Sequence, residues 1–356
     1  FTLAAPIRKT VAYYLCKDWW TRPAFVKTPA EIPGRTELLL LQTEEGCLAL
    51  SPALSNGAHL QFAPSGEPQT VRVQVKFTEC GISAFEGPVC YAFSHPDPEQ
   101  ALSGLMRRLC GVYGVPARDG RPYPETLEYL GWCSWDAFYR EVDAEKLLAK
   151  CEEAREKEIP FGWMIIDDGW QSVDGNERMT AYGENREKFP EGLKACVERM
   201  RALCGVRTVG VWHAFAGYWS DVREGSPLWQ EKREDLVRNG RGQWLPAPEK
   251  APDFYGPWHQ YLSENGIGLL KVDSQRTLPV HYRGCAPYAE AAAGLHRGLD
   301  ESAETWMQGN LINCMGMAKE NIFSRPKSGV SRNSDDFFPR VEGSFEEHLL
   351  QNAYNS

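Results

Sequence analysis

Beyond residue 127, several short apolar runs end in residues that can do chemistry. Carboxylates, a lysine, an arginine, a histidine and several tryptophans follow these runs directly. Because the active sites of parallel β/α barrels lie at the carboxyl ends of their strands, we expect these side chains to share one rim. The segments concerned are 131–136, 166–171, 210–215, 271–273 and 331–336.

Paired carboxylates at such a rim suit glycoside cleavage. In a retaining enzyme one carboxylate is the nucleophile and the other is general acid and then base, with the two about 5–5.5 Å apart. Asp273 is one candidate, because Lys271 lies two residues earlier on the same strand face and its ammonium would keep that carboxylate ionised. The other candidate is Asp335 or Asp336, with Arg332 close by in the sequence.

Further residues at the strand ends have sugar-binding chemistry. The carboxylates of Asp167 and Asp168 would accept hydrogen bonds from sugar hydroxyls, and the rings of Trp135, Trp170 and Trp212 would offer stacking faces. Each feature also has an ordinary structural explanation. Asp-Asp-Gly is often a turn or a helix cap, and most large aromatic residues belong to the core.

Three other features have structural explanations as well. Lys-x-Asp on a strand is usually a surface ion pair worth about 0–1 kcal/mol. A lone histidine such as His213 is more often structural than a base. Cys314 reads as a buried thiol rather than a nucleophile, because no histidine partner can be assigned to it.

Composition excludes several other classes of function. The 356 residues include 39 Lys and Arg against 48 Asp and Glu, and the resulting net charge of −9 disfavours nucleic acid or an anionic membrane as the main partner. No stretch approaches the roughly 18 apolar residues of a membrane span. The 11 cysteines form no C-x-x-C pair, and neither they nor the 7 histidines have zinc-ligand spacing. We therefore expect reduced thiols, a cytoplasmic protein, and neither metal nor cofactor.

The first part of the chain is predicted to be all-β. Residues 71–77 alternate apolar and polar side chains, and Gly-, Asn- and Pro-containing turns separate several short runs, which suggests a β-sandwich. Asp97 and Pro98 are typical of a helix start, and the helix should run to Tyr113. We expect an N-terminal β-sandwich domain at 1–116 and a linker at 117–126.

After the linker, alternating strands and helices predict an α/β fold, a (β/α)8 TIM barrel. Only six strands are found, so the catalytic barrel domain at 127–356 should lack its last strands. An incomplete barrel leaves open edges, and we expect this chain alone to be poorly folded or inactive. The expected strands are 129–135, 161–166, 206–215, 268–272, 311–315 and 329–332, and the expected helices are 143–157, 190–203, 257–265, 288–307 and 345–354.

The strand-end motifs as a set resemble glycoside hydrolase family 36, and most closely its branch of raffinose synthases and seed-imbibition proteins. The resemblance runs in order from about residue 127 to the last residue. The β-rich first hundred residues also resemble the N-terminal β-sandwich of that family, with much lower specificity. The motifs are Gly-Trp-Cys-Ser-Trp-Asp-Ala-Phe at 131–138, Ile-Ile-Asp-Asp-Gly-Trp-Gln at 165–171, Val-Gly-Val-Trp-His-Ala at 209–214, Lys-Val-Asp at 271–273 and Ser-Asp-Asp-Phe-Phe-Pro at 334–339.

The resemblance implies a retaining, metal-free, α-galactosidase-like mechanism. By motif matching, Asp273 would form the covalent galactosyl-enzyme and Asp335 would be the acid/base, with Asp336 the weaker choice for that role. Asp167 and Asp168 would bind the 4- and 6-hydroxyls of galactose. Lys271 would hold a ring hydroxyl, Arg332 would lie on the 2-hydroxyl side, and two tryptophans would shape the pocket. The expected substrate-binding set is Asp167, Asp168, Trp135, Trp170, Trp212, His213, Lys271, Arg332, Asp336 and Cys314.

Several alternatives remain open for an oligosaccharide or glycoside substrate. A galactosyltransferase of the raffinose or stachyose synthase type would share the covalent intermediate, and an α-galactosaminidase or α-N-acetylgalactosaminidase would change only the sugar. A catalytically inactive sugar-binding protein is disfavoured because both candidate carboxylates are present. The loop 274–276, Ser-Gln-Arg, departs from the family pattern and should help to set the choice of aglycone. Residues 313–317, Asn-Cys-Met-Gly-Met, replace a Gly-rich bacterial segment and favour the plant-like branch.

Overall fold

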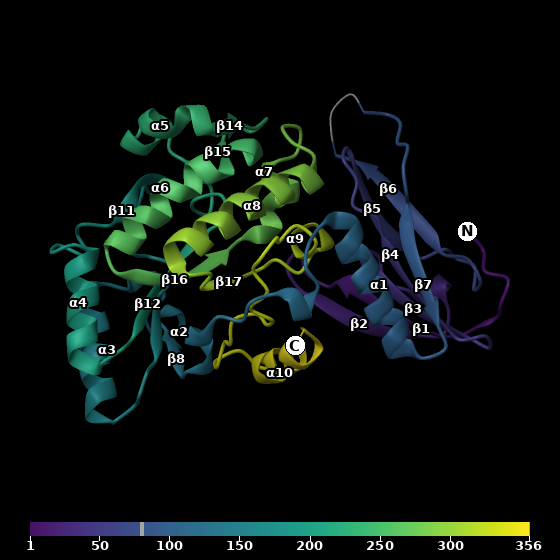
Figure 1. Ribbon diagram of the computed structural model, residues 1–356, viewed down its shortest axis with the longest axis horizontal. Coiled ribbons are helices and arrows are strands. Elements are labelled where there is room, and N and C mark those ends of the chain that lie inside the picture. Colours follow the sequence, from purple (N-terminus) through teal and green to yellow (C-terminus); the bar gives the residue numbers. More distant parts are fainter. Residues whose placement is uncertain (79–81, 356) are drawn as a thin grey trace.

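The N-terminal part of the chain is a sheet of seven antiparallel strands, seen on the right of Figure 1 in the computed structural model, which describes residues 1–78 and 82–355. The strand order is β2-β1-β3-β4-β7, and the β5–β6 hairpin branches from β3 through the pair Thr36 and Phe62. The predicted β-rich region is confirmed, and the packing of a sandwich stays a prediction. The strands are β1 (Ile7–Leu15), β2 (Thr21–Val26), β3 (Thr36–Thr43), β4 (Cys47–Pro52), β5 (Ala58–Ala63), β6 (Arg72–Phe77) and β7 (Cys90–His95).

Alternation along β3 sends successive side chains to opposite faces of this sheet. Leu39 and Leu41 pack into one buried cluster with residues of β1 and β5. Leu38 and Leu40 face the second cluster, which the sheet forms with helix α1 (Pro98–Tyr113). Both faces of β3 are therefore covered, which explains its almost continuous apolar run.

Helix α1 begins and ends where the sequence predicts. The carboxylate of Asp97 accepts a hydrogen bond from the Gln100 backbone N–H at 2.9 Å, and Pro98 occupies the first turn. The helix ends at Tyr113, where Gly114 adopts a left-handed φ of 67°.

The second part of the chain contains a sheet of five parallel strands in the order β8-β9-β12-β16-β17. Each strand pairs with its successor in this set, which is the arrangement of a partial (β/α) barrel. The sixth expected strand is reduced to one parallel bridge between Asn313 and Ser331. The strands are β8 (Gly131–Cys133), β9 (Trp163–Ile166), β12 (Thr208–Ala214), β16 (Ile267–Asp273) and β17 (Leu311–Asn313).

Helices cover this parallel sheet, with α6 and α8 lying side by side over it (Figure 1). The helix expected at 257–265 was given the wrong first residue. Helix α6 begins at Ala251 and carries Pro257 in its interior. Pro252, in the first turn, is the proline that fits a helix start. The helices are α2 (Trp135–Phe138), α3 (Ala144–Glu156), α4 (Leu193–Cys204), α5 (Pro227–Lys232), α6 (Ala251–Glu264), α7 (Leu278–His281), α8 (Tyr288–Met307), α9 (Lys319–Ile322) and α10 (Ser344–Asn355).

A second five-stranded sheet was not predicted from the sequence. Its strands come from the connections that follow β9 and β12, and they are two to seven residues long. Such short strands carry too few alternating positions to be recognised in a sequence. They are β10 (Gln171–Val173), β11 (Arg178–Glu184), β13 (Asp221–Val222), β14 (Leu236–Arg238) and β15 (Trp244–Pro246).

The two parts of the chain meet through buried charges. Glu37 of β3 accepts a hydrogen bond from the backbone N–H of Lys319 at 2.8 Å. The ammonium of Lys319 lies 2.7 Å from Glu320 and 3.7 Å from Glu37, and His59 of β5 lies 3.3 Å from Glu320. Arg121, inside the predicted linker, donates to the backbone carbonyls of Arg325 and Ser328. The domain boundaries themselves stay predictions.

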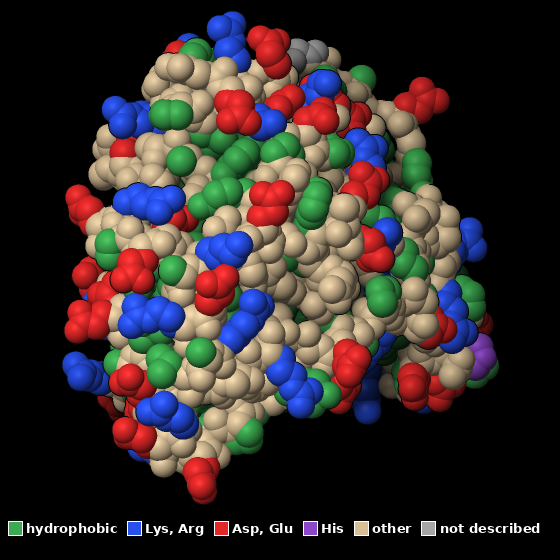
Figure 2. Space-filling view, turned by 60° about the vertical axis from the view of Figure 1, so that its left-hand side comes forward, with side chains coloured by type: hydrophobic (Ala, Val, Ile, Leu, Met, Phe, Trp, Pro, Cys, Tyr) green, Lys and Arg blue, Asp and Glu red, His purple; other side chains and the backbone are tan. Residues whose placement is uncertain are grey.

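The C-terminal helix α10 lies against β2 of the N-terminal sheet. Thr21 donates to the Asn355 side chain at 2.6 Å, and Arg22 forms an ion pair with Glu347. On the face shown in Figure 2, acidic and basic side chains are interspersed rather than gathered by sign. Within 1–78 and 82–355, no helix has both the length and the apolar character that a membrane crossing needs.

Candidate active site

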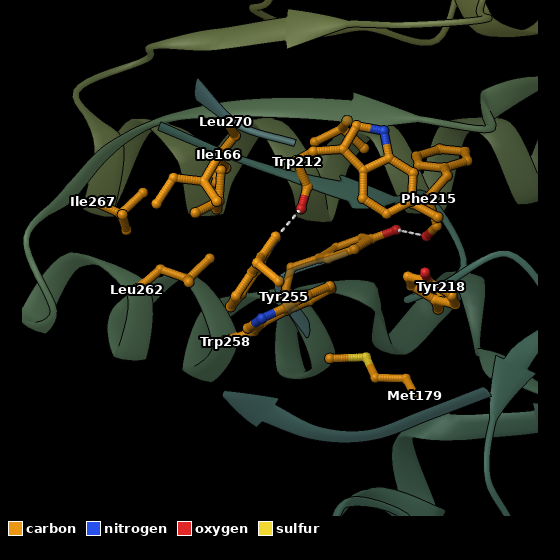
Figure 3. Close-up of a cluster of buried hydrophobic side chains, with 14 of the residues drawn as sticks. Ile166, Met179, Trp212, Phe215, Tyr218, Tyr255, Trp258, Leu262, Ile267 and Leu270 are labelled. Carbon is orange, nitrogen blue, oxygen red and sulfur yellow. Dashed lines mark hydrogen bonds between the residues drawn. The ribbon is translucent and has the colours of Figure 1, made fainter. Parts of the chain in front are cut away.

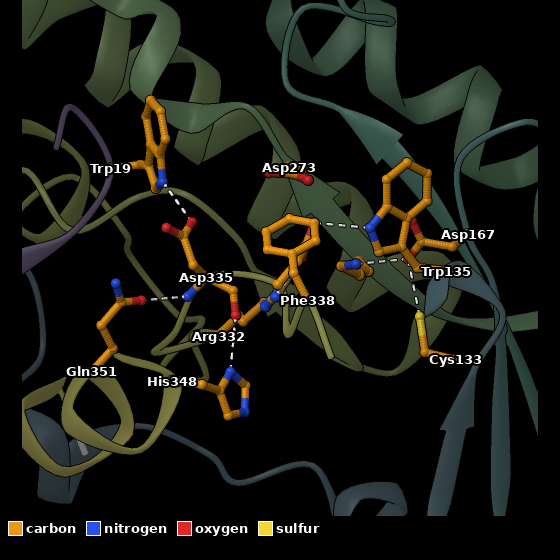
Figure 4. Close-up of polar contacts among 12 residues, drawn as sticks. Trp19, Cys133, Trp135, Asp167, Asp273, Arg332, Asp335, Phe338, His348 and Gln351 are labelled. Carbon is orange, nitrogen blue, oxygen red and sulfur yellow. Dashed lines mark hydrogen bonds and ion pairs between the residues drawn. The ribbon is translucent and has the colours of Figure 1, made fainter. Parts of the chain in front are cut away.

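A cavity of about 320 Å³ lies at the carboxyl ends of the parallel strands. We call it the rim cavity, and Figure 4 shows the polar side chains around it. It brings together residues from the ends of β9, β12, β16 and β17 and from the segment after the Ser331 bridge. The predicted residues that line it are Asp273, Asp335, Asp336, Asp167, Asp168, Trp135, Trp212, Lys271, Arg332 and Cys314.

Asp273 ends β16 and is only 6% exposed. One carboxylate oxygen accepts from the indole N–H of Trp212 at 3.0 Å, and the other accepts from the backbone N–H of Ser274 at 2.6 Å. Cys314 lies beside the same carboxylate, and burial followed by the charge of Asp273 raises the pKa of its thiol well above the ordinary value. Cys314 therefore stays a thiol, in line with the reading that it is no nucleophile.

Lys271 forms its hydrogen bond with Asp167, a partner that the sequence did not indicate, while the charge of Asp273 also acts on it. Its Nζ lies 2.6 Å from the Asp167 carboxylate, which also accepts from the Cys133 thiol at 3.0 Å. Burial by itself lowers the pKa of Lys271, but the carboxylate of Asp167 and further neighbours raise it above the usual value. This pair is a charged, buried contact. Lys271 and Asp273 are themselves each only 6% exposed, so a surface location for the Lys-x-Asp motif is wrong.

Asp168 is held by three side-chain donors. They are the Tyr218 hydroxyl at 2.5 Å, the Trp219 indole at 2.7 Å and the Arg140 guanidinium at 3.0 Å. Sequence reasoning missed Tyr218 and Trp219, although an adjacent aromatic pair shortly after the third strand could have signalled them. Trp219 also lines the rim cavity, so this network positions one of its walls.

Asp335 and Asp336 differ in their surroundings. Asp336 accepts from the indole of Trp135 at 2.8 Å and lies 2.5 Å from the Arg332 guanidinium. Asp335 accepts instead from residues of the turn between β1 and β2, which sequence reasoning did not connect with the site: Lys17, Trp19 at 2.9 Å and Trp20 at 2.6 Å.

The protonation of Asp335 follows from these contacts. Burial raises the pKa of this carboxyl, but the hydrogen bonds from Lys17, Trp19 and Trp20 together lower it below its ordinary value. The resting state of Asp335 is therefore a carboxylate. In Figure 4, the Trp19 ring points its N–H edge directly at this group.

Two predicted site residues lie outside the rim cavity. Trp170 is fully buried in the core, where its indole donates to the backbone carbonyl of Trp212 at 2.7 Å. His213 follows Trp212 on β12, so its side chain faces the opposite side of the sheet. There its Nε2 lies 3.1 Å from Nε2 of His259 on α6, and burial lowers the pKa of His213 to about 4. Figure 3 shows a part of the buried core in which Trp212, Tyr255 and Trp258 are labelled.

The fold is that of the α-galactosidases of glycoside hydrolase family 36. The chain is similar to TtGalA, the α-galactosidase of Thermus thermophilus in complex with stachyose, with a TM-score of 0.63 and 19% identity over 99% of this chain and 77% of that one. It is also similar to AgaA of Geobacillus stearothermophilus in complex with stachyose, with a TM-score of 0.59 and 16% identity over 99% of this chain and 53% of that one.

The sequence comparison identifies the family. The family model for raffinose synthase or seed imbibition protein Sip1 matches residues 8–356, and the chain belongs to this family. It is 29% identical to the probable galactinol–sucrose galactosyltransferase 6 of Arabidopsis thaliana, over 96% of this chain and 52% of that protein. It is 28% identical to the stachyose synthase of Pisum sativum, over 96% and 55%. The resemblance predicted from the motifs is confirmed, and the chain spans about half the length of these relatives.

Proposed function

We propose that the rim cavity binds an α-linked galactosyl group and transfers it through a covalent intermediate on Asp273. The observation that carries the proposal is the convergence of Asp273 and Asp335 on one cavity at the carboxyl ends of a parallel sheet. The buried Lys271–Asp167 pair lines the same cavity and offers charged partners for sugar hydroxyls. Arg332 and the Cys314 thiol line the same cavity and offer further donors.

In the first step, a carboxylate oxygen of Asp273 attacks the anomeric carbon of the galactosyl group. The bond from that carbon to the leaving-group oxygen breaks, and Asp335 gives this oxygen a proton that it must first take up from solvent, because its resting form is the carboxylate. In the second step, Asp335 takes the proton of an incoming hydroxyl whose oxygen attacks the same carbon, and Asp273 is released. The three donors around Asp335 stabilise its carboxylate, the form that the second step requires.

The incoming hydroxyl can belong to water or to a sugar, so hydrolysis and transfer share this site. Curated relatives named galactosyltransferases and a stachyose synthase favour transfer to a sugar acceptor. Solved relatives of the same fold are α-galactosidases, which favours hydrolysis.

The ten described cysteines are all free thiols, which supports the predicted cytoplasmic location.

Replacing the nucleophile tests the proposal. Asp273→Asn removes the attacking carboxylate while keeping its shape, so whatever rate of nitrophenol release from p-nitrophenyl α-galactoside the parent protein has should fall by at least ~10³-fold. Binding of galactose, measured by calorimetry, should persist. The exposed Asp253 on α6, which lies 3.5 Å from Lys250, provides the matched control Asp253→Asn. Undiminished turnover in Asp273→Asn would remove the mechanism.

Product analysis separates the two candidate reactions. With p-nitrophenyl α-galactoside as donor, transfer predicts that added sucrose yields a trisaccharide in place of free galactose. Hydrolysis predicts free galactose at all sucrose concentrations, because water then outcompetes the acceptor at the galactosyl-enzyme.

A further inference from the structure

A second cavity, of about 370 Å³, lies where the N-terminal sheet meets the partial barrel. We call it the junction cavity. Strand β6 contributes Lys76 and Phe77 to one wall, and the segment from α7 to the start of α8 contributes Arg283 and Tyr288 to the other (Figure 1). Among the described residues, none lines both this cavity and the rim cavity. The junction cavity is therefore a separate candidate site, which neither proposed step of the reaction uses.

The junction cavity is positively charged, although the chain carries a net charge of −9. Its described lining includes four cations against two carboxylates, which leaves an excess of two positive charges. The rim cavity has the opposite balance, with five carboxylates against three cations. Electrostatic attraction therefore directs an anionic ligand to the junction cavity and away from the rim cavity. The charged residues of the junction cavity are Arg35, Lys76, Arg276, Arg283, Asp18 and Glu320.

Two of the four cations are held in place by their neighbours. Asp18 lies 2.7 Å from the Arg35 guanidinium and 3.8 Å from that of Arg276, so one carboxylate contacts both. The Arg276 guanidinium also lies 4.9 Å from the centroid of the Trp19 ring. The two guanidinium groups are thereby pre-organised for the bidentate contacts that arginine makes with phosphate oxygens.

The other two cations, Lys76 and Arg283, carry charges that no described carboxylate neutralises. Both residues are exposed, and within 1–78 and 82–355 neither forms an ion pair. The carboxylate of Glu320, in contrast, already has the Lys319 ammonium at 2.7 Å. The charge that is not neutralised therefore comes from both walls of the cavity, with one cation on β6 and one directly after α7.

We infer that the junction cavity is a binding site for a small phosphate monoester. A monoester carries up to two negative charges near neutral pH, which matches the excess of two positive charges in the lining. Phe77, which is 42% exposed, and Tyr288 offer apolar contact to the organic part of the ligand. The volume of the cavity suits a small molecule, since such sites typically measure about 300–1,000 Å³. Its occupation requires no catalysis at the rim cavity.

Calorimetry with phosphate esters tests this site. At about 150 mM salt, which screens weak surface contacts, glucose 6-phosphate should bind with one-to-one stoichiometry, and glucose should not displace it. Lys76→Met and Arg283→Met each remove one exposed charge and should raise the Kd of glucose 6-phosphate about tenfold, the factor for one lost charge-assisted hydrogen bond. Both variants should fold, because neither residue is buried. AMP and inorganic phosphate are further probes, because they carry the same charge on a different organic part or on none.

Matched controls separate this site from general charge effects. Lys9→Met on β1 and Arg297→Met on α8 remove exposed charges outside both cavities and should leave the Kd unchanged. Arg283→Lys keeps the charge and should retain most of the affinity.

Four results would overturn the site. They are binding of none of the three phosphates at about 1 mM, a Kd that Lys76→Met and Arg283→Met leave unchanged, an equal rise of the Kd in the control variants, and displacement of glucose 6-phosphate by galactose. The last result would place the ligand in the rim cavity. Failure of the parent protein to bind galactose would remove the proposed function and leave the junction site intact.

Discussion

Asp273 and Asp335 are the same type of residue, and their neighbours give them different chemistry. One indole and one backbone N–H hold Asp273, whereas two indoles and an ammonium hold Asp335. Strand-end position was enough to bring both into one cavity, because parallel strands point their carboxyl ends at one rim. The donors of Asp335 could not be predicted, since they lie more than 300 positions away in the sequence.

Removing one donor of Asp335 should change how the activity depends on pH. Lys17→Met takes away an ammonium that lowers the pKa of this carboxyl, so the pKa should rise. A general acid acts in its protonated form, and the alkaline limb of kcat/KM should therefore move to higher pH. Profiles with p-nitrophenyl α-galactoside would measure the shift, and Lys27→Met, at an exposed lysine directly after β2, is the control. A shift to lower pH, or an unchanged limb, would contradict the assignment of Asp335 as the acid.

At the scale of elements, local signals decided what the sequence could predict. Helix α1 was predicted in full because Asp97 and Pro98 mark its start, and in the structure Gly114 caps its end. The second sheet escaped prediction because its short strands have no local periodicity, and its pairing joins segments from two separate connections. The hydrogen-bonded partner of Lys271 was missed for a related reason. Its neighbour on β16 was visible in the sequence, whereas Asp167 reaches it from β9.

The contact between β12 and α6 should make stability fall in mild acid. Burial lowers the pKa of His213 to about 4, and it lowers that of His259 well below its ordinary value. Below about pH 6.5 the histidines of the unfolded chain take up protons, whereas the buried imidazoles stay neutral. Their contribution to the free energy of unfolding is therefore fully present above about pH 6.5 and is lost as the pH falls to about 4. For His213 alone the full loss is of order 3 kcal/mol.

Urea unfolding between pH 7 and pH 4 would measure this dependence. The free energy of unfolding of His213→Leu should vary less steeply with pH than that of the parent, because one buried neutral imidazole is gone. His95→Leu replaces an exposed imidazole and should keep the parent slope. If the free energy of unfolding of His213→Leu varied with pH as steeply as that of the parent, this histidine would not be a buried neutral group.

At the scale of the whole molecule, one buried ionic network joins the N-terminal sheet to the partial barrel. Lys319 is 3% exposed and forms ion pairs with both Glu37 and Glu320. Burial raises the pKa of Glu320, but the Lys319 ammonium and then His59 bring it below its ordinary value, so the pair stays charged. Sequence reasoning separated the chain into two domains and found no link between them. The residues of this network lie far apart along the chain and belong to no motif.

Lys319→Met should weaken the whole molecule. It leaves Glu37 and Glu320 without their cation in a buried site, which typically costs about 3–5 kcal/mol. Chemical denaturation would measure the loss, and limited proteolysis should then cut between the two parts of the chain. Lys327→Met, at a side chain 47% exposed and 3.9 Å from Glu304, should change stability by less than about 1 kcal/mol. Equal stability of both variants would mean that the network contributes nothing to the junction.

The hydrogen bonds from Trp19 and Trp20 to Asp335 also constrain the order of events during folding. They join residues separated by 316 and 315 positions, and contacts of such separation form late because loop closure costs chain entropy. Both indoles therefore meet the carboxylate only after the N-terminal sheet and the parallel sheet have formed. In a refolding experiment, far-ultraviolet circular dichroism should recover first. The fluorescence change of these indoles and the catalytic activity should return together in a later, slower phase.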